Sequence, residues 1–246
     1  MTQIVYGLHA VESLIQHQPD SIRQLYFDKK RQDQRLQQLL EQAERQGIRC
    51  SACDRKTLDD KAEQQRHQGI VAECSDNRQQ PPLEDLLDSL NEPAFLLVLD
   101  GVTDPHNLGA CLRTADAAGV HAVIIPKDKS AGLNATVRKV ACGAAEVMPL
   151  YAVTNLARCL QQLQQRGIWI TGTAGEAQQD IYNADMTGPM ALVMGAEGKG
   201  LRRLTREQCD YLVKLPMAGT VSSLNVSVAT GICLYEMVRQ RSLKTA

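Results

Sequence analysis

The sequence predicts an α/β protein: a parallel sheet with helices on both faces, preceded by a small α/β domain. Beyond residue 93, four short segments are almost continuously apolar, which is typical of strands buried on both faces. The stretches between these segments are long enough for crossover helices. A polar, proline-containing stretch at residues 77–92 separates this part from the first 76 residues and predicts a domain boundary.

The first 76 residues predict a small α/β domain. The segments IRQLYFD (22–28) and GIVAEC (69–74) have the apolar character of strands. Between them, RLQQLLEQAERQG places Leu36, Leu39 and Leu40 at helical spacing and ends at Gly47, a residue that commonly terminates helices. We therefore expect a small domain over residues 1–76, followed by a linker over residues 77–92 in which LEDLLDSL forms one short helix.

Residues 93–246 predict the larger domain. The expected strands are FLLVLD (95–100), HAVIIP (121–126), GIWITGT (167–173) and ALVMG (191–195). Residues 107–118 and 155–166 have patterns suited to crossover helices. This alternation of strands and helices favours an open parallel sheet.

Composition argues for a cytoplasmic protein with reduced cysteines. The N-terminus lacks a cationic stretch followed by an apolar run, and no segment is apolar over the length of a bilayer. The eight cysteines are scattered, unlike a secreted disulfide framework. Cys50 and Cys53 form a single C-x-x-C without a second pair, so we interpret them as structural, with redox or metal use as the lesser alternative.

The overall charge does not indicate a nucleic-acid partner, because 27 basic residues are balanced by 28 acidic ones. An RNA-binding surface would have to come from local clusters, and solvated helix faces explain each cluster equally well. The two candidate clusters are Arg23, Lys29, Lys30, Arg31 and Arg35, and Arg202, Arg203 and Arg206.

The first of three segments with candidate chemistry is LDGVTDPHNLGACLRTA (99–115). In open α/β sheets, ligands bind at the loops that follow the carboxyl ends of strands, and this segment follows one. Asn107 is a plausible helix N-cap, and Arg113 lies six positions later. Asp100, Asp104 and His106 have no recognisable ligand spacing, so we expect no metal.

The other two segments follow later strands. LVMGAEGKGL (192–201) places three glycines around Glu197 and Lys199 but lacks the phosphate-binding loop pattern. KLPMAGTVSSLNVSVAT (214–230) leads into a helix expected to begin near residues 222–225. Capping by Ser222 or Ser223 leaves the remaining polar residues unexplained, which favours a site.

Taken in order, the three segments resemble the signature motifs of the SpoU branch of the SPOUT superfamily. The shared patterns are N-x-G-x-x-x-R (Asn107, Gly109 and Arg113), M-G-x-E-x-x-G (194–200) and P-M-x-G-x-x-x-S-L-N-V-S (216–227). The resemblance covers roughly residues 93–240. YGLHAV (6–11) and HQGIVAE (67–73) are similar to the small substrate-binding domain of one subgroup.

This resemblance implies a C-terminal trefoil knot, a homodimer and S-adenosylmethionine as cofactor. The implied activity is 2′-O-methylation of a ribose, with a guanosine of large-subunit (23S) ribosomal RNA as target. Two alternatives stay open. One is a transfer-RNA ribose methyltransferase of the same family, and the other is a catalytically silent RNA-binding ribosome-assembly factor.

The resemblance also implies site residues. Cofactor contacts fall on Thr173, Gly195, Leu215 and Leu224, where glycine permits close approach and apolar walls suit an adenine ring. Catalysis or target binding falls on Asn107, Arg113, Glu197, Ser223 and Asn225. A guanidinium is a poor base, since its reference pKa is about 12.5 or higher. We therefore interpret Arg113 as a phosphate clamp that also stabilises the developing alkoxide.

Overall fold

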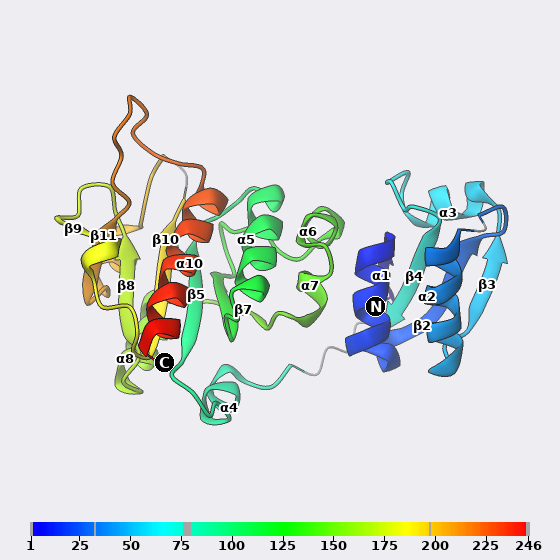
Figure 1. Cartoon of the computed structure of the whole chain (residues 1–246), viewed down its shortest axis with the longest axis horizontal. Helices are drawn as coiled ribbons and strands as arrows, with labels where there is room; N and C mark the ends of the chain where they lie inside the picture. The colour runs from blue at the N-terminus through cyan, green and yellow to red at the C-terminus, as the bar shows by residue number, and fades with distance from the viewer. Residues whose placement is uncertain (1, 32, 76–79, 197, 245–246) are drawn as a thin grey trace. The chain divides into compact units, whose positions relative to one another are not determined.

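The computed structural model describes residues 2–31, 33–75, 80–196 and 198–244. The described chain divides into two compact units (Figure 1). Unit 1 comprises residues 1–80 and 133–147, and unit 2 comprises residues 81–132 and 148–246. Within the described ranges, no helix has both the length and the apolar character needed to cross a bilayer.

Unit 1 is built on a small mixed sheet. Its strand order is β1-β4-β2-β3, in which β4 runs antiparallel to both β1 and β2, and β3 runs parallel to β2. The elements are β1 (Thr2–Tyr6), α1 (Leu8–His17), η1 (Pro19–Ser21), β2 (Ile22–Asp28), α2 (Gln34–Arg45), β3 (Cys50–Cys53), α3 (Arg55–Lys61), β4 (Ile70–Ser75), α6 (Ala135–Ala141) and α7 (Ala144–Val147).

The α2 helix shows how the sequence pattern produces this unit. Asp33 caps it by accepting a hydrogen bond from the Leu36 backbone N–H at 3.2 Å. Leu36, Leu39 and Ala43 are buried on one face in the core between helix and sheet. His67 is also structural here, because its Nδ1 accepts from the Gly69 backbone N–H at 3.0 Å.

Cys50 and Cys53 lie at the two ends of β3 and pack in different apolar clusters. Their separation of three residues places them on opposite faces of the strand. Each thiol donates to a backbone carbonyl at 3.6 Å, Cys50 to Ile48 and Cys53 to Phe27. Burial raises the pKa of both thiols. The structural role of the pair stays a prediction.

Unit 2 contains the large sheet. Its elements are α4 (Leu83–Asp88), β5 (Phe95–Asp100), α5 (Pro105–Ala117), β6 (Ala122–Pro126), β7 (Leu150–Val153), α8 (Leu156–Gln165), β8 (Trp169–Thr173), β9 (Gln179–Asp180), η2 (Ile181–Asn183), β10 (Met190–Gly195), α9 (Arg203–Glu207), β11 (Tyr211–Lys214) and α10 (Val226–Lys244). Among the described residues, seven strands pair in the order β7-β6-β5-β10-β8-β11-β9, all parallel.

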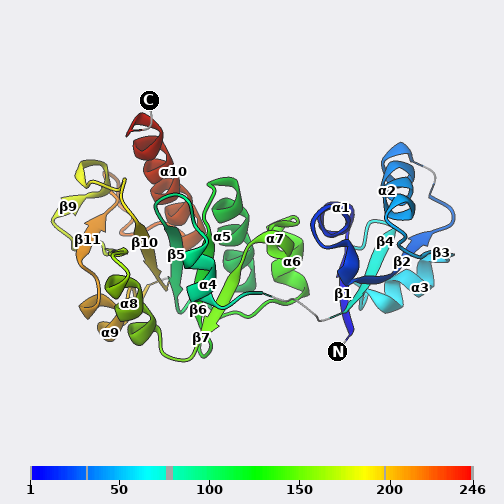
Figure 2. The ribbon, with the colours of Figure 1, turned by 90° about the horizontal axis from the view of Figure 1, so that it is seen from below.

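Helices cover both faces of the large sheet (Figure 2). Leu96 and Val98 of β5 point to the face covered by α8 and α4, whose leucines complete that core. On the other face, the Arg241 guanidinium of α10 lies 4.5 Å from the centre of the Phe95 ring. The neighbouring α5 is joined to α10 by a hydrogen bond from the Cys111 thiol to the Thr230 hydroxyl at 3.6 Å.

The predicted fold class is confirmed, with two corrections at helix starts. Asp104, not Asn107, caps α5, since its carboxylate accepts from the His106 backbone N–H at 2.9 Å and Pro105 takes the first helical position. α10 begins at Val226 and is capped by Asn225, whose Oδ1 accepts from the Ser227 N–H at 2.9 Å. The trefoil knot stays a prediction of the family resemblance.

Candidate functional site

Four parallel strands of the large sheet end side by side at what we call the carboxyl edge, formed by Asp100, Thr173, Gly195 and Lys214. These are the last residues of β5, β8, β10 and β11. The three segments with candidate chemistry all leave the sheet at this edge. The parallel strand order therefore brings together loops that are about 100 residues apart in the chain.

The first cavity at this edge, the leucine cavity, is bounded by Leu215 and Leu224 and has a volume of about 400 Å³. All four residues expected to contact the cofactor line it, namely Thr173, Gly195, Leu215 and Leu224. The Thr173 hydroxyl donates to the Val193 carbonyl at 3.2 Å, which fixes the end of β8 against β10. The volume lies in the range of small-molecule sites, and the leucines supply apolar walls for a flat ring.

Gly195 is required by the closeness of the chain around it. A Cβ built on Gly195 would lie 2.2 Å from the backbone carbon of Gly200 and 2.5 Å from the Leu201 nitrogen. Ala196 and Gly200 exchange backbone hydrogen bonds of 3.1 and 2.9 Å, which hold the loop in this position. No side chain fits between strand β10 and the loop, so the cavity wall at this point is bare backbone.

Cys233 forms part of the floor of the leucine cavity. The side chain is buried, and this burial raises the pKa of the thiol to about 12. The thiol therefore stays protonated near neutral pH and is a weak nucleophile.

A second cavity, the lysine cavity, lies beside the first and is named for Lys129 and Lys199 in its lining. Its volume is about 610 Å³. The two cavities share part of their lining at Ala196, Lys199, Gly200 and Val226. A ligand in one cavity would thus lie next to a ligand in the other, as a donor and an acceptor must.

A buried ion pair fixes the chain just after Gly200, between the two cavities. Asp100 is fully buried at the end of β5, and its Oδ2 accepts from the Arg202 backbone N–H at 2.9 Å. The Arg202 guanidinium pairs with the other carboxylate oxygen. The pair holds Arg202 against the end of β5. It also neutralises the Asp100 carboxylate, whose charge would be costly to bury alone.

Asn107 and Asn225 connect the first and third segments. The Asn225 Nδ2 donates to the Asn107 Oδ1 at 2.9 Å, across 118 positions of sequence. The same Asn225 side chain caps α10 through its Oδ1, which also accepts from the Ser227 hydroxyl at 2.6 Å. Asn107 is buried and lines the lysine cavity. The asparagine pair thus holds the starts of α5 and α10 together beside both cavities.

The remaining predicted site residues differ in their placement. Ser223 is exposed in the loop before α10 and lines the leucine cavity. Arg113 is exposed on α5, six residues after Asn107. Glu197 lies outside the described residues. The structure brings Asn107 and Ser223 to the cavities and holds Asn225 against Asn107, whereas Arg113 is exposed and lines neither cavity.

Ion pairing changes the interpretation of the basic clusters. Arg202 pairs with Asp100, Arg203 with Glu207 and Arg206 with Glu176. In the first cluster, Arg31 pairs with Asp33 and Arg35 with Glu12. The second cluster therefore offers little unneutralised charge, whereas Arg23, Lys29 and Lys30 of the first remain exposed.

Sequence reasoning missed two features of the site. It did not pair Asp100 with Arg202, because their 102-residue separation gives no local signal. It also overlooked Lys129, although this lysine follows a buried strand and lies in a loop after its carboxyl end. That position was the available signal. Within the described chain, no three His, Cys, Asp or Glu side chains are grouped as metal ligands would be.

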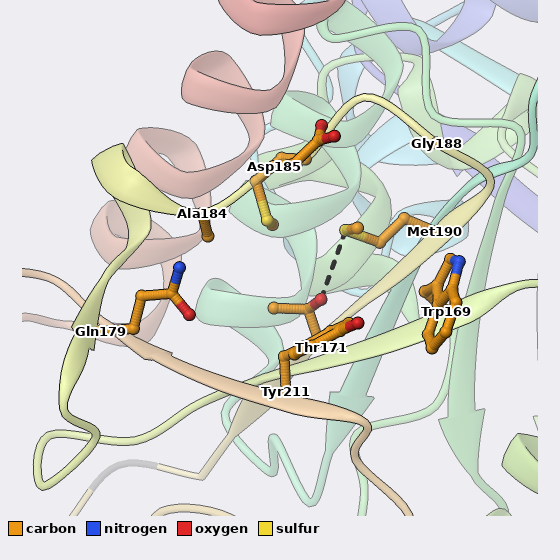
Figure 3. A pocket seen from close by; sticks show the side chains of 9 residues that line it. Trp169, Thr171, Gln179, Ala184, Asp185, Gly188, Met190 and Tyr211 are labelled. Atoms are coloured by element: carbon orange, nitrogen blue, oxygen red, sulfur yellow. Dashed lines mark hydrogen bonds between the residues drawn. The ribbon is translucent and has the colours of Figure 1, made fainter.

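A third cavity, the tryptophan cavity, lies at the opposite edge of the sheet and has a volume of about 320 Å³ (Figure 3). Trp169, Met190 and Tyr211, the first residues of β8, β10 and β11, line it. The Trp169 and Tyr211 rings lie 5.5 Å apart, and the Thr171 hydroxyl donates to the Met190 sulfur at 3.3 Å. Its lining contains the carboxylate of Asp185 and no lysine or arginine.

Two family descriptions match the chain. Residues 94–235 match the SpoU rRNA Methylase family, a region that includes all three motifs and more than half of the chain. The chain belongs to the SpoU rRNA methylase family. Residues 4–80 of this SpoU methylase match a second family, described as RNA 2'-O ribose methyltransferase substrate binding. The resemblance inferred from the three motifs is confirmed.

Relatives match this SpoU methylase over nearly its whole length. The 23S rRNA (guanosine-2'-O-)-methyltransferase RlmB of Pseudomonas putida is 60% identical over 242 residues, covering 98% of this chain and 97% of the relative. The protein of the same name from Escherichia coli strain K12 is 59% identical over 244 residues, covering 98% and 100%.

Solved structures share the fold. The SpoU methyltransferase AviRb from Streptomyces viridochromogenes in complex with AdoMet has a TM-score of 0.81 and 26% identity, covering 98% of this chain and 91% of that one. The AdoMet-bound rRNA methyltransferase from Sinorhizobium meliloti has a TM-score of 0.77 and 25% identity, covering 97% and 87%.

Proposed function

We propose that this chain transfers a methyl group from S-adenosylmethionine to the ribose 2′-hydroxyl of a guanosine in 23S ribosomal RNA. One observation carries the proposal: loops from three distant segments converge on two cavities that share a wall at the carboxyl edge. The names of the relatives that cover nearly the whole chain supply the substrate and the atom methylated.

The leucine cavity suits the cofactor. Leu215 and Leu224 provide apolar walls for the adenine ring, and Gly195 exposes backbone where a Cβ would collide with the facing loop. When bound, S-adenosylmethionine supplies a methyl group on a sulfonium, ready for in-line displacement. The protonated Cys233 thiol in the floor does not compete with the RNA for that methyl group, because burial keeps its pKa at about 12.

The residues around the lysine cavity act on the acceptor. Asn107 and Asn225 orient the target ribose beside the shared wall, and their mutual hydrogen bond fixes both side chains. Arg113 holds substrate phosphate and stabilises the developing alkoxide, with a water or the substrate phosphate taking the proton. Ser223 and, by its place in the second motif, Glu197 complete the set of target-binding residues.

Residues 1–76 form the substrate-binding module of this proposal, joined through residues 77–92 to a methyltransferase domain over residues 93–246. An ordinary ribose gives the catalytic domain little sequence information. A second module that recognises RNA by its shape and phosphates is therefore needed. The exposed Arg23, Lys29 and Lys30 supply cations for those contacts. Reversing the charges of Lys29 and Lys30 together should raise the KM for RNA and leave cofactor affinity unchanged.

The protein acts in this proposal as a cytoplasmic homodimer. Val228 and Tyr235 of α10 are each 51% exposed and, seven residues apart, lie on the same face of the helix. A second copy covering this apolar stripe would remove it from water. Tyr235→Glu should convert the dimer into a monomer by light scattering, and an unchanged mass would count against the dimer face.

The activity is tested with labelled S-adenosylmethionine, unmethylated 23S ribosomal RNA and transfer RNA. Label should appear in 23S ribosomal RNA, and mass spectrometry of digested RNA should locate it as 2′-O-methylguanosine. Label in transfer RNA alone would replace the substrate by the family alternative. Cofactor binding by calorimetry without transfer to any RNA would favour the catalytically silent assembly factor.

A further inference from the structure

The lysine cavity has a charge pattern that the cofactor and the motif residues do not explain. Three cationic side chains line it, from Lys129, Lys199 and Arg202, together with the carboxylates of Asp100 and Asp104. Arg202 is committed to the buried Asp100. Asp104 is committed to the N-terminus of α5, where the helix dipole stabilises its charge.

Lys129 and Lys199 have no such partner. Neither forms an ion pair with any residue in the part of the chain that the structure describes. Their ammonium groups therefore give the lysine cavity an excess of positive charge beside the wall that it shares with the leucine cavity. An anion entering the cavity would gain two charge-assisted contacts without breaking an existing pair.

The backbone of Lys129 is a second, independent observation. Lys129 has a φ of 59°, in the left-handed region that residues with a Cβ rarely occupy. The following residues hold it there, since the Ala131 N–H and the Ser130 hydroxyl both donate to the Val102 carbonyl, at 2.8 and 3.3 Å. Strained residues of this kind collect at ligand sites, where the surrounding structure fixes them.

We propose that the lysine cavity is a phosphodiester-binding site, in which Lys129 and Lys199 hold the RNA phosphates that adjoin the target ribose. The proposal rests on the function proposed above and extends it to two residues outside the motif assignments. Lys199 lines both cavities, so a phosphate held there places the neighbouring ribose at the shared wall. Phosphate contacts position a nucleic acid without reading its sequence.

The tryptophan cavity provides an internal comparison for this choice. It is also open and lies on the same sheet, yet its lining offers a carboxylate and no cation. A phosphodiester would be repelled there and attracted to the lysine cavity.

The test measures three properties of Lys129→Ala, Lys199→Ala and the matched control Lys127→Ala. Lys127 lies two residues before Lys129, is exposed and does not line the cavity. The properties are the KM for 23S ribosomal RNA, the salt dependence of RNA binding, and S-adenosylmethionine affinity by calorimetry. Loss of one phosphate contact should raise the KM by about 10-fold and lower the log–log salt slope by about one.

The cofactor affinity of Lys129→Ala should stay at the wild-type value, because Lys129 lines only the lysine cavity, and Lys127→Ala should match wild type in all three properties. A fourth variant, Lys129→Gly, relieves the left-handed backbone, so its unfolding midpoint should rise by about 2–4 °C while RNA binding weakens. That combination separates a ligand contact from a merely structural residue.

Wild-type salt slopes in both Lys129→Ala and Lys199→Ala would overturn the proposal. This result is distinguishable from failure of the proposed function, because wild-type protein would still methylate 23S ribosomal RNA. If wild-type protein methylates no RNA, the proposed function fails, and the salt slopes for RNA binding still decide whether the cavity holds phosphate.

Discussion

The two edges of the large sheet are built on the same strands and differ in chemistry. At the amino edge, Trp169, Met190 and Tyr211 begin β8, β10 and β11 and pack side chains into the tryptophan cavity (Figure 3). At the carboxyl edge, Thr173 and Gly195 end two of these strands beside bare backbone and polar loops. The difference teaches that strand direction decides where a parallel sheet can assemble a site.

The largest effect is expected when one glycine at the carboxyl edge is replaced by alanine and compared with the same replacement at the amino edge. Gly195→Ala should lower methylation by more than about 1,000-fold, because the added Cβ moves the loop shared by both cavities and misplacement by 1 Å costs about 100-fold by itself. Gly188→Ala at the tryptophan cavity is the matched control, because a Cβ added at Gly188 has no heavy atom within 4 Å. Activity and calorimetric cofactor binding measure the effect, and equal activities would erase the distinction between the edges.

The next largest effect is expected at Arg113. Arg113→Ala should reduce single-turnover methylation by roughly 100- to 1,000-fold, the range seen when one stabilising donor is removed from a transition state. Arg113→Lys keeps the charge but loses the planar fork, so it should recover only part of the rate. RNA binding is measured separately. Full activity in Arg113→Ala would remove this residue from the mechanism.

Asn107→Ala tests the link between α5 and α10. We expect a rate about 10- to 100-fold lower, because the target ribose loses an oriented partner. Unfolding free energy should fall by only about 0.5–1.5 kcal/mol for the lost hydrogen bond, since the cap of α5 belongs to Asp104. Thermal unfolding and turnover are compared in the same preparation. An unchanged turnover number would assign Asn107 a purely structural role.

A smaller effect, on stability rather than activity, is expected at the amino edge. Trp169→Ala removes the ring that lies 5.5 Å from Tyr211, which should lower the unfolding free energy by about 0.5–1.5 kcal/mol. Methylation should stay within about twofold of wild type, as for a surface change away from the site. Denaturant titration and the RNA assay measure the two quantities. A large loss of activity would give the tryptophan cavity a functional role.

The smallest effect concerns Cys233 at the floor of the carboxyl-edge cavity. Burial raises its pKa to about 12, so the reactive thiolate is rare below that pH and iodoacetamide should not label it between pH 7 and 9. The exposed Cys142 is the internal control. Peptide mapping by mass spectrometry measures both. Labelling of Cys233 at the rate of Cys142 would show that the floor of the cavity opens to solvent.

Local sequence signals predicted the buried central strands and missed strands that are partly exposed or very short. The apolar run at Phe95–Asp100 marks β5 because both of its faces are buried. β7 and β9, the two outermost strands of the sheet, were not predicted. β7 is half-exposed, and β9 has only two residues. The Asp104-Pro105 pair at the start of α5 carried the true cap signal, and Asn107 was chosen in its place.

The sequence by itself determined the fold class, the family and the residue types of the site, because burial patterns and motif spacing are local properties of the chain. Tertiary structure decided the partnerships. Asp100 meets Arg202, and Asn107 meets Asn225, only because β10 pairs with β5 and α10 packs beside α5. Such pairings depend on hydrogen bonds and packing between segments about 100 residues apart, for which a single sequence contains no local signal.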